Sequence, residues 1–168
     1  PALPVYHTHG LFVATNTLLL CGGRILFRRK FDADDVMQLL PQATCLMGVP
    51  TFYTRLLQHA GLTREVTAQM RLFISGSAPL LAETHRAFSG RTGHAILERY
   101  GMTETNMNTS NPYDGERRAG TVGFPLPDVS VAAVYALVAQ NRPDLVSRLR
   151  SDPTPHIQRA LRDRDTNQ

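Results

Sequence analysis

Short apolar runs alternate with segments of helical spacing along most of the chain. The runs are "RILF" (24–27), "TCLMGV" (44–49), "RLFIS" (71–75) and "AILERY" (95–100), and each predicts a strand. Strands that alternate with helices indicate βαβ units around a mostly parallel sheet, so we expect an α/β fold. In open sheets of this kind ligands bind beyond the carboxyl ends of the strands, which directs attention to the loops that follow them.

Helix start signals stand between these runs. Asp32 is placed to cap one helix and Pro50 to open a second, while residues 80–88 have the spacing of a third. The alternation stops near residue 134. We therefore predict a domain over 1–134 and, over 135–168, a divergent arginine-rich tail of unknown role.

Composition narrows the class of protein. The chain has 168 residues, of which 42% are hydrophobic and 19% charged, as in a globular domain. The formal charge is +4, but no aromatic residues accompany the arginines and no nucleic-acid motif appears, so nucleic acid is not an expected partner. Cys21 and Cys45 lack CxxC spacing and suggest reduced thiols. Without a signal peptide or an apolar run that could span a bilayer, we expect a cytoplasmic protein with no membrane partner.

The loop after the third apolar run is "GSAPL" (76–80). Gly76 allows a ligand to approach the backbone closely. Ser77 and the amides around Ala78 offer hydrogen-bond donors. A strand-to-helix turn capped by Ser77 explains the same residues without a ligand.

The loop after the fourth run is "GMTETNMNTSN" (101–111). Thr103 offers a hydroxyl, Glu104 a carboxylate suited to Mg²⁺, and Tyr100 a ring that can stack on a flat ligand. The alternative is a capping box that opens a helix at Thr103. The Asn, Ser, Pro and Gly residues that follow favour turns over a helix. Both interpretations stay open.

The segment "PVYHTHG" (4–10) holds His7 and His9 at positions i and i+2. Such a pair can bind zinc, but the rest of a tetrahedral ligand set is missing nearby. A histidine at the mouth of a pocket and a structural histidine are the other interpretations. The chain has no GxSxG, GxGxxG or GxxxxGK[ST] motif, so serine-hydrolase, dinucleotide and P-loop sites have no support.

Taken in order, four segments resemble the adenylate-forming superfamily of acyl-CoA synthetases, non-ribosomal adenylation domains and luciferases. They are "PVYHTHG", "GVPTFYTRLL", "RLFISGSAPL" and "ERYGMTETNMNTSNPYDGERRAGTVGFPLPDV", and the resemblance covers residues 1 to about 133. Within the superfamily the last segment is most similar to the malonyl-CoA synthetases. This resemblance implies an AMP-forming ligase, in which malonate or methylmalonate and ATP give an acyl adenylate and diphosphate. Coenzyme A then displaces AMP, and Mg²⁺ is the implied metal.

The resemblance also implies roles on the nucleotide side. Thr103 would hydrogen-bond a phosphate, Glu104 would coordinate Mg²⁺ and Tyr100 would stack on adenine. The other nucleotide-binding residues that it implies are Ser77, Ala78, Glu98, Arg99, Gly101 and Met102.

On the acyl side, His7 matches a gating residue that shifts between the two half-reactions and joins Thr103 and Glu104 as a catalytic residue. The acyl pocket would be formed by His7, Thr8, His9 and Met107. A dicarboxylate also needs a cation for its distal carboxylate, and arginine binds carboxylates bidentately. We expect Arg55 in this role, with Arg86 as second choice.

The 168 residues lack segments that the family carries elsewhere. They contain neither its phosphate loop nor, beyond residue 134, its ribose-binding aspartate and catalytic lysine. We therefore expect part of a ligase site that is inactive by itself; the alternative is a non-catalytic nucleotide-binding or interaction module. Part of a larger sheet would leave uncovered edges, which predicts self-association.

Overall fold

The computed structural model describes residues 2–132. The chain divides into two compact units, Pro1–Phe124 and Pro125–Gln168, and every feature of the candidate site belongs to the first. The predicted domain boundary at residue 134 and the tail 135–168 lie outside the described residues. Among those described, no helix is long and apolar enough to cross a membrane.

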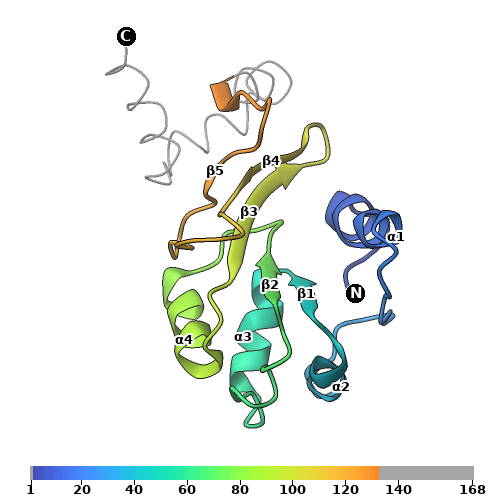
Figure 1. Ribbon diagram of the computed structural model, residues 1–168, viewed down its shortest axis with the longest axis vertical. Coiled ribbons are helices and arrows are strands. Elements are labelled where there is room, and N and C mark those ends of the chain that lie inside the picture. The colour runs from blue at the N-terminus through green and yellow to red at the C-terminus, as the bar shows by residue number, and fades with distance from the viewer. Residues whose placement is uncertain (1, 133–168) are drawn as a thin grey trace. The chain divides into compact units, whose positions relative to one another are not determined.

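A five-stranded sheet in the order β1-β2-β3-β4-β5 forms the centre of the fold (Figure 1). Its strands are β1 Cys45–Gly48, β2 Leu72–Ser75, β3 Leu97–Met102, β4 Asn106–Ser110 and β5 Phe124–Pro125. The first three are parallel, with Cys45 opposite Leu72 and Ile74 opposite Leu97, whereas β4 is antiparallel to β3. The predicted α/β class with a mostly parallel sheet is confirmed.

Three helices follow the predicted start signals. They are α2 Ala33–Leu39, α3 Pro50–Gln58 and α4 Ala82–Thr92. The Asp32 carboxylate accepts a hydrogen bond from the amide of Asp35 at 3.1 Å, and Pro50 is the first residue of α3. A 3₁₀ turn, Leu40–Gln42, lies between α2 and β1 in the chain.

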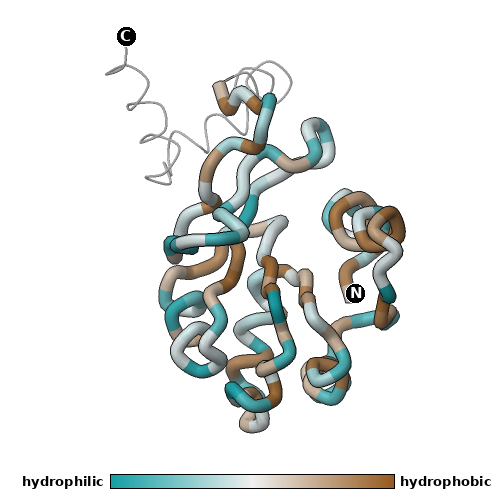
Figure 2. Tube along the Cα trace, in the orientation of Figure 1, coloured by the Kyte–Doolittle hydropathy of each residue, from teal (hydrophilic) through white to brown (hydrophobic). Residues whose placement is uncertain are grey.

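Two segments differ from the sequence prediction. Residues 24–27 form no strand. Within residues 2–132 the hydrogen-bonded neighbour of β1 is β2 alone, so the run 24–27 is not paired with it. The N-terminal apolar stretch, for which no helix was predicted, forms a π-helix, η1, at His9–Asn16 that continues into α1 at Thr17–Leu20. Figure 2 shows the hydrophobic residues of this η1–α1 segment; its large exposed apolar side chains are Leu11, Phe12, Leu19 and Leu20.

The main core lies between the sheet and the helices α3 and α4. Tyr53, Phe73 and Phe88 are fully buried there, and the ring of Phe88 packs edge-on against both of the others, with centroids 5.3 and 4.9 Å apart. The Tyr53 hydroxyl donates to the carbonyl of Ile74 at 2.5 Å. Because side chains alternate along a strand, Leu72 and Ile74 form a smaller cluster on the opposite face.

Arg91, in the last turn of α4, anchors the connection that follows α3. Its Nε donates to the carbonyl of Leu62 and its Nη1 to that of Leu57, both at 2.7 Å. Its Nη2 donates to the carbonyls of His59 and Ala60 at 2.9 and 3.0 Å. A single side chain thus satisfies main-chain acceptors that a helix end leaves without partners.

Candidate functional site

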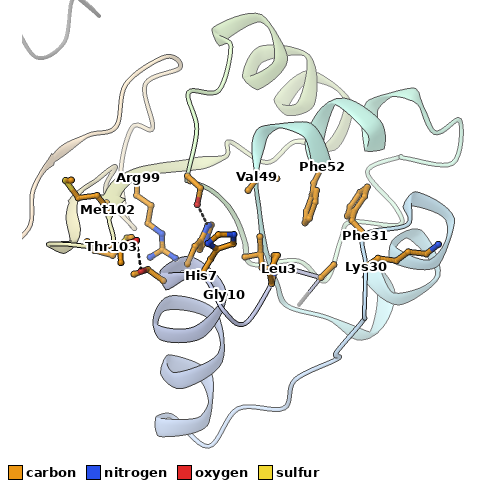
Figure 3. A pocket seen from close by; sticks show the side chains of 18 of the residues that line it. Leu3, His7, Gly10, Lys30, Phe31, Val49, Phe52, Arg99, Met102 and Thr103 are labelled. Atoms are coloured by element: carbon orange, nitrogen blue, oxygen red, sulfur yellow. Dashed lines mark hydrogen bonds between the residues drawn. The ribbon is translucent and has the colours of Figure 1, made fainter. Parts of the chain in front are cut away.

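A pocket of about 700 Å³ opens beyond the carboxyl ends of β1, β2 and β3, where a parallel sheet is expected to bind ligands. Its walls come from residues 2–4 and 7–10, from 29–31, from Val49 and Phe52, from 76–77, and from 99, 101–103 and 107. In Figure 3, Arg99, Met102 and Thr103 lie toward one end, Phe31, Phe52 and Lys30 toward the other, and His7 and Gly10 between them.

Most of the residues implied by the sequence meet in this pocket, although they come from three distant segments. Thr8 and Thr103 are 95 positions apart, yet the Thr8 hydroxyl donates to the Thr103 hydroxyl at 3.5 Å. The predicted residues that line the pocket are His7, Thr8, His9, Ser77, Arg99, Gly101, Met102, Thr103 and Met107.

His9 is the most buried titratable group in the pocket wall, with 6% of its surface exposed. Its Nδ1 lies 3.1 Å from the Ser77 hydroxyl oxygen, and its Nε2 is buried without a partner among the described residues. Burial, and then the positive charge of Arg99, lower the pKa of His9 to about 4. The imidazole is therefore neutral at pH 7.

Arg99 projects from β3 into the same pocket as a cation with no counter-charge in the described part of the chain. Its Nη2 lies 3.7 Å from the Met47 sulfur, its Nε is buried without a partner, and it forms no ion pair within residues 2–132. Burial lowers the pKa of Arg99 to about 10, so the guanidinium stays charged at neutral pH. A half-buried, unpaired guanidinium is stabilised by an anionic ligand.

Thr103 and Glu104 lie in a tight turn between β3 and β4, closed by a bond from the amide of Thr105 to the carbonyl of Met102 at 3.3 Å. Since a strand follows the turn, the capping-box alternative is wrong. Thr103 lines the pocket, whereas the exposed Glu104 and the Tyr100 ring, 41% exposed, lie outside its wall. Burial and then the Glu104 charge raise the pKa of Tyr100.

Gly101 is required for this turn. A Cβ at this position would lie 2.3 Å from the carbonyl oxygen of Asn106 and 2.3 Å from the Cε of Met107. The register of β3 and β4 also shifts between Tyr100 and Gly101. Only a residue without a side chain allows the two strands to approach so closely at the pocket.

The other predicted residues lie away from the pocket wall. Ala78 is exposed in the turn after β2, and Glu98 is buried, with its carboxylate accepting from the amide of Gly120 at 3.2 Å. Burial raises the pKa of Glu98 to about 7. Arg86 is exposed on α4, and the exposed Arg55 stacks over the Phe31 ring at 4.9 Å, so neither arginine lines the pocket.

The pocket also contains residues that the sequence analysis did not identify. Arg29, Lys30 and Phe31 come from the loop before α2, and the rings of Phe31 and Phe52 stack with centroids 4.0 Å apart. In the sequence, these loop residues belong to the stretch "RRKF" (28–31), in which three cations are followed by an aromatic residue, a combination that suits an anionic ligand. From sequence alone, such a run of cations is not distinguishable from the solvated charges of an ordinary surface loop.

The donor atoms fit magnesium better than zinc. Within residues 2–132 no three His, Cys, Asp or Glu side chains gather as a metal site, and the Nδ1 of His9 faces Ser77. Mg²⁺ accepts one carboxylate together with substrate phosphates and water. Glu104 provides such a carboxylate: it is exposed beside Thr103 and forms no ion pair in the described part of the chain.

Comparison with known proteins places these features in context. A family model described as AMP-binding enzyme matches residues 1–140. The chain is 37% identical to malonate–CoA ligase of Arabidopsis thaliana over 147 residues, which are 76% of this chain and 24% of the relative. The chain thus spans about a quarter of the length of the curated relatives that it matches.

Solved structures resemble it as well. ATP-bound MatB from Rhodopseudomonas palustris is 68% identical, with a TM-score of 0.74 over 75% of this chain and 25% of that one. A malonyl-CoA ligase ternary product complex with methylmalonyl-CoA and AMP bound is 43% identical, with a TM-score of 0.70 over 75% of this chain and 28% of that one.

Proposed function

Because the chain belongs to the AMP-binding enzyme family, we propose that it forms part of the nucleotide and acyl site of a malonate–CoA ligase. In the proposed reaction a malonate carboxylate oxygen attacks the α-phosphorus of ATP, releasing diphosphate and giving malonyl adenylate. The thiol of coenzyme A then attacks the acyl carbon and displaces AMP. The relatives support this proposal, since one is named a malonate–CoA ligase and another holds methylmalonyl-CoA and AMP.

The choice of a dicarboxylate substrate rests on one observation: Arg99 lines the pocket without an ion-pair partner among the described residues. One carboxylate of malonate reacts at phosphorus, so the second must be held by the protein. A guanidinium binds a carboxylate through two parallel hydrogen bonds. Arg99 lines the pocket and has no acidic partner among residues 2–132, whereas Arg55 and Arg86 lie outside the pocket wall. We therefore assign the distal carboxylate to Arg99 in preference to the two arginines expected from sequence.

Thr103 and Glu104 serve the nucleotide side of the site. The Thr103 hydroxyl would donate to a phosphate oxygen, and Glu104, in the same turn, would hold Mg²⁺. The metal would neutralise the negative charge that accumulates on the phosphates during transfer. Tyr100, whose ring is partly exposed, supplies a stacking face for the base. His7 is exposed at the pocket, which leaves it free to change position between the two half-reactions.

Arg29 and Lys30 add positive charge at the other end of the pocket. Neither forms an ion pair among the described residues, and both are exposed. Their chemistry suits phosphate groups of ATP or of coenzyme A. The adjacent Phe31–Phe52 stack offers an apolar wall for the uncharged part of such a ligand.

Isothermal titration of the chain with ATP and Mg²⁺ tests the nucleotide half of this proposal. We expect binding that depends on Mg²⁺ and that Glu104→Ala weakens about tenfold or more, since a charged contact is lost. Glu83→Gln, which changes an exposed acid on α4 outside the pocket, is the matched control and should bind as the parent chain does.

Titration with malonate and malonate-dependent ATP–diphosphate exchange test the acyl half. Exchange would exclude a non-catalytic nucleotide-binding module, whereas binding of both ligands without exchange agrees with a part-site that is inactive by itself. A folded chain that binds neither ATP–Mg²⁺ nor malonate would contradict the proposed function.

A further inference from the structure

Ser77 has a backbone conformation that is costly for a residue with a side chain. Its φ is 69°, in the left-handed region, which residues other than glycine seldom occupy. Its side chain lines the pocket, and its hydroxyl oxygen lies 3.1 Å from the Nδ1 of His9. A strained, partnered hydroxyl at a pocket wall indicates that its direction matters.

The neighbouring glycine leaves room for this pairing. A Cβ on Gly76 would lie 3.3 Å from the Cε1 of His9 and 3.5 Å from the carbonyl oxygen of Arg99. The imidazole therefore packs directly on the β2–α4 turn, and its orientation is fixed by that contact. This fit places Nδ1 against Ser77 and encloses Nε2 among protein atoms.

The surroundings of the ring decide which nitrogen carries its proton. A neutral imidazole has one N–H and one lone pair. Nδ1 has an acceptor in Ser77, whereas Nε2 is buried without any partner among the described residues. An unpaired buried N–H is rarer and more costly than an unpaired acceptor. The proton therefore belongs on Nδ1, and the pKa of His9, lowered to about 4 by burial and then by the charge of Arg99, keeps the ring neutral.

We propose that His9 is a positioning residue: its Nδ1–H donates to the oxygen of Ser77 and thereby directs the only hydroxyl proton of Ser77 into the pocket. A hydroxyl has one proton and two lone pairs. When His9 occupies a lone pair, the proton is free to donate to an oxygen of the ligand. Ser77 becomes an oriented donor for a carboxylate, and His9 acts through it without touching the substrate. This inference deepens the proposed function and rests on it for the identity of the ligand.

The tautomer is measured directly in the ligand-free chain. Long-range ¹H–¹⁵N correlation of the histidine rings at pH 7 should show His9 with a protonated Nδ1 and an unprotonated Nε2, with His9→Asn used to assign its resonances. The opposite tautomer, with the proton on Nε2, would overturn the inference whatever ligand the pocket takes.

Malonate titrations then test the coupling between the two side chains. His9→Phe keeps an aromatic ring of similar size but removes the donor, and we expect malonate to bind about three- to tenfold more weakly, the loss typical of one neutral hydrogen bond. Ser77→Ala should weaken binding by a similar factor. The double variant should be no weaker than Ser77→Ala, because His9 acts only through that hydroxyl.

His9→Asn tests whether another hydrogen-bond donor can restore the malonate binding that His9→Phe loses. The Asn amide nitrogen reaches the position of Nδ1 and can donate to Ser77, so malonate binding should return to within about threefold of the parent chain. A merely structural role for the ring would instead make His9→Asn worse than His9→Phe. Additive losses in the double variant would likewise refute the proposal. If the parent chain does not bind malonate at all, the proposed substrate is wrong, and the tautomer alone decides the inference for His9.

Discussion

The hydroxyl of Thr8 donates to the hydroxyl of Thr103 across 95 positions of sequence. This bond joins the segment before the π-helix to the β3–β4 turn. It also occupies a lone pair of the Thr103 oxygen, so the Thr103 proton remains available for a phosphate. The segment "PVYHTHG" and the β3–β4 turn are thus linked by a direct contact.

Replacement of Thr103 by Val should weaken the interaction with ATP. The valine keeps the shape of the side chain and removes the donor. We therefore expect ATP to bind roughly ten- to hundredfold more weakly, the loss typical of one hydrogen bond to a charged group. Thr8→Val should have a smaller effect, because it removes only the supporting bond. Equal effects of the two variants would contradict a direct role for Thr103.

Arg99→Met should abolish discrimination in favour of a dicarboxylate. The variant keeps the length of the side chain but loses its charge, and we expect malonate affinity to fall about a hundredfold, the scale of a desolvated charge pair. Titration with malonate and with acetate measures the loss. Arg86→Met on α4 is the matched control and should leave both affinities unchanged. A large effect of Arg86→Met would instead support Arg86, the second choice from sequence, as the residue that binds the distal carboxylate.

Glu98 makes stability depend on pH. Burial raises its pKa to about 7 from an ordinary value of 4.5, so the folded protein favours the protonated carboxyl. Between these values the folded state binds more protons than the unfolded state. The stability contributed by protonated Glu98 is therefore present below pH 4.5 and is lost as the pH rises through about 7.

Urea unfolding of the parent chain and of Glu98→Gln at pH 5 and pH 8 measures this effect. The glutamine does not ionise and retains an oxygen for the Gly120 amide. Its stability relative to the parent should increase between pH 5 and pH 8, by at most about 3 kcal/mol. A pH-independent difference between the two proteins would show that Glu98 does not titrate in this range.

Arg91→Met should destabilise the fold without changing the pocket. Four carbonyl oxygens would lose a charged donor, and we expect a loss of about 2–4 kcal/mol in the free energy of unfolding, since several hydrogen bonds to a charged group are removed. Urea unfolding provides the measurement. Arg86→Met, on an exposed position of the same helix, should lie within about 0.5 kcal/mol of the parent.

Two glycines give opposite predictions for the same substitution. Gly101→Ala would place its Cβ 2.3 Å from the Asn106 carbonyl oxygen, so β3 and β4 must separate, and we expect both thermal stability and ATP binding to fall. Gly90→Ala has nothing within 4 Å of its Cβ in α4 and should stabilise the chain by about 1 kcal/mol through helix propensity. Thermal melting of the two variants should therefore shift in opposite directions.

Local chemistry was sufficient to predict some elements and not others. Asp32 and Pro50 begin helices through contacts within a few residues, so their roles could be read from the chain. The strand expected at 24–27 failed because pairing depends on a partner that local sequence does not specify. Local sequence also did not give the direction of the Arg99 side chain. Whether that side chain faces the pocket or the core depends on which face of β3 it occupies, and the packing of helices on the sheet decides which face is the core.

The connection after α3 depends on the side chain of Arg91 but not on the side chains of the residues that Arg91 contacts. The four hydrogen bonds that Arg91 donates within residues 2–132 all go to main-chain oxygens, which every amino acid provides. An exposed partner such as Ala60 can therefore change during evolution or in a mutant library while the connection after α3 stays in place. Selection on such a library should tolerate many side chains at position 60 and few at position 91.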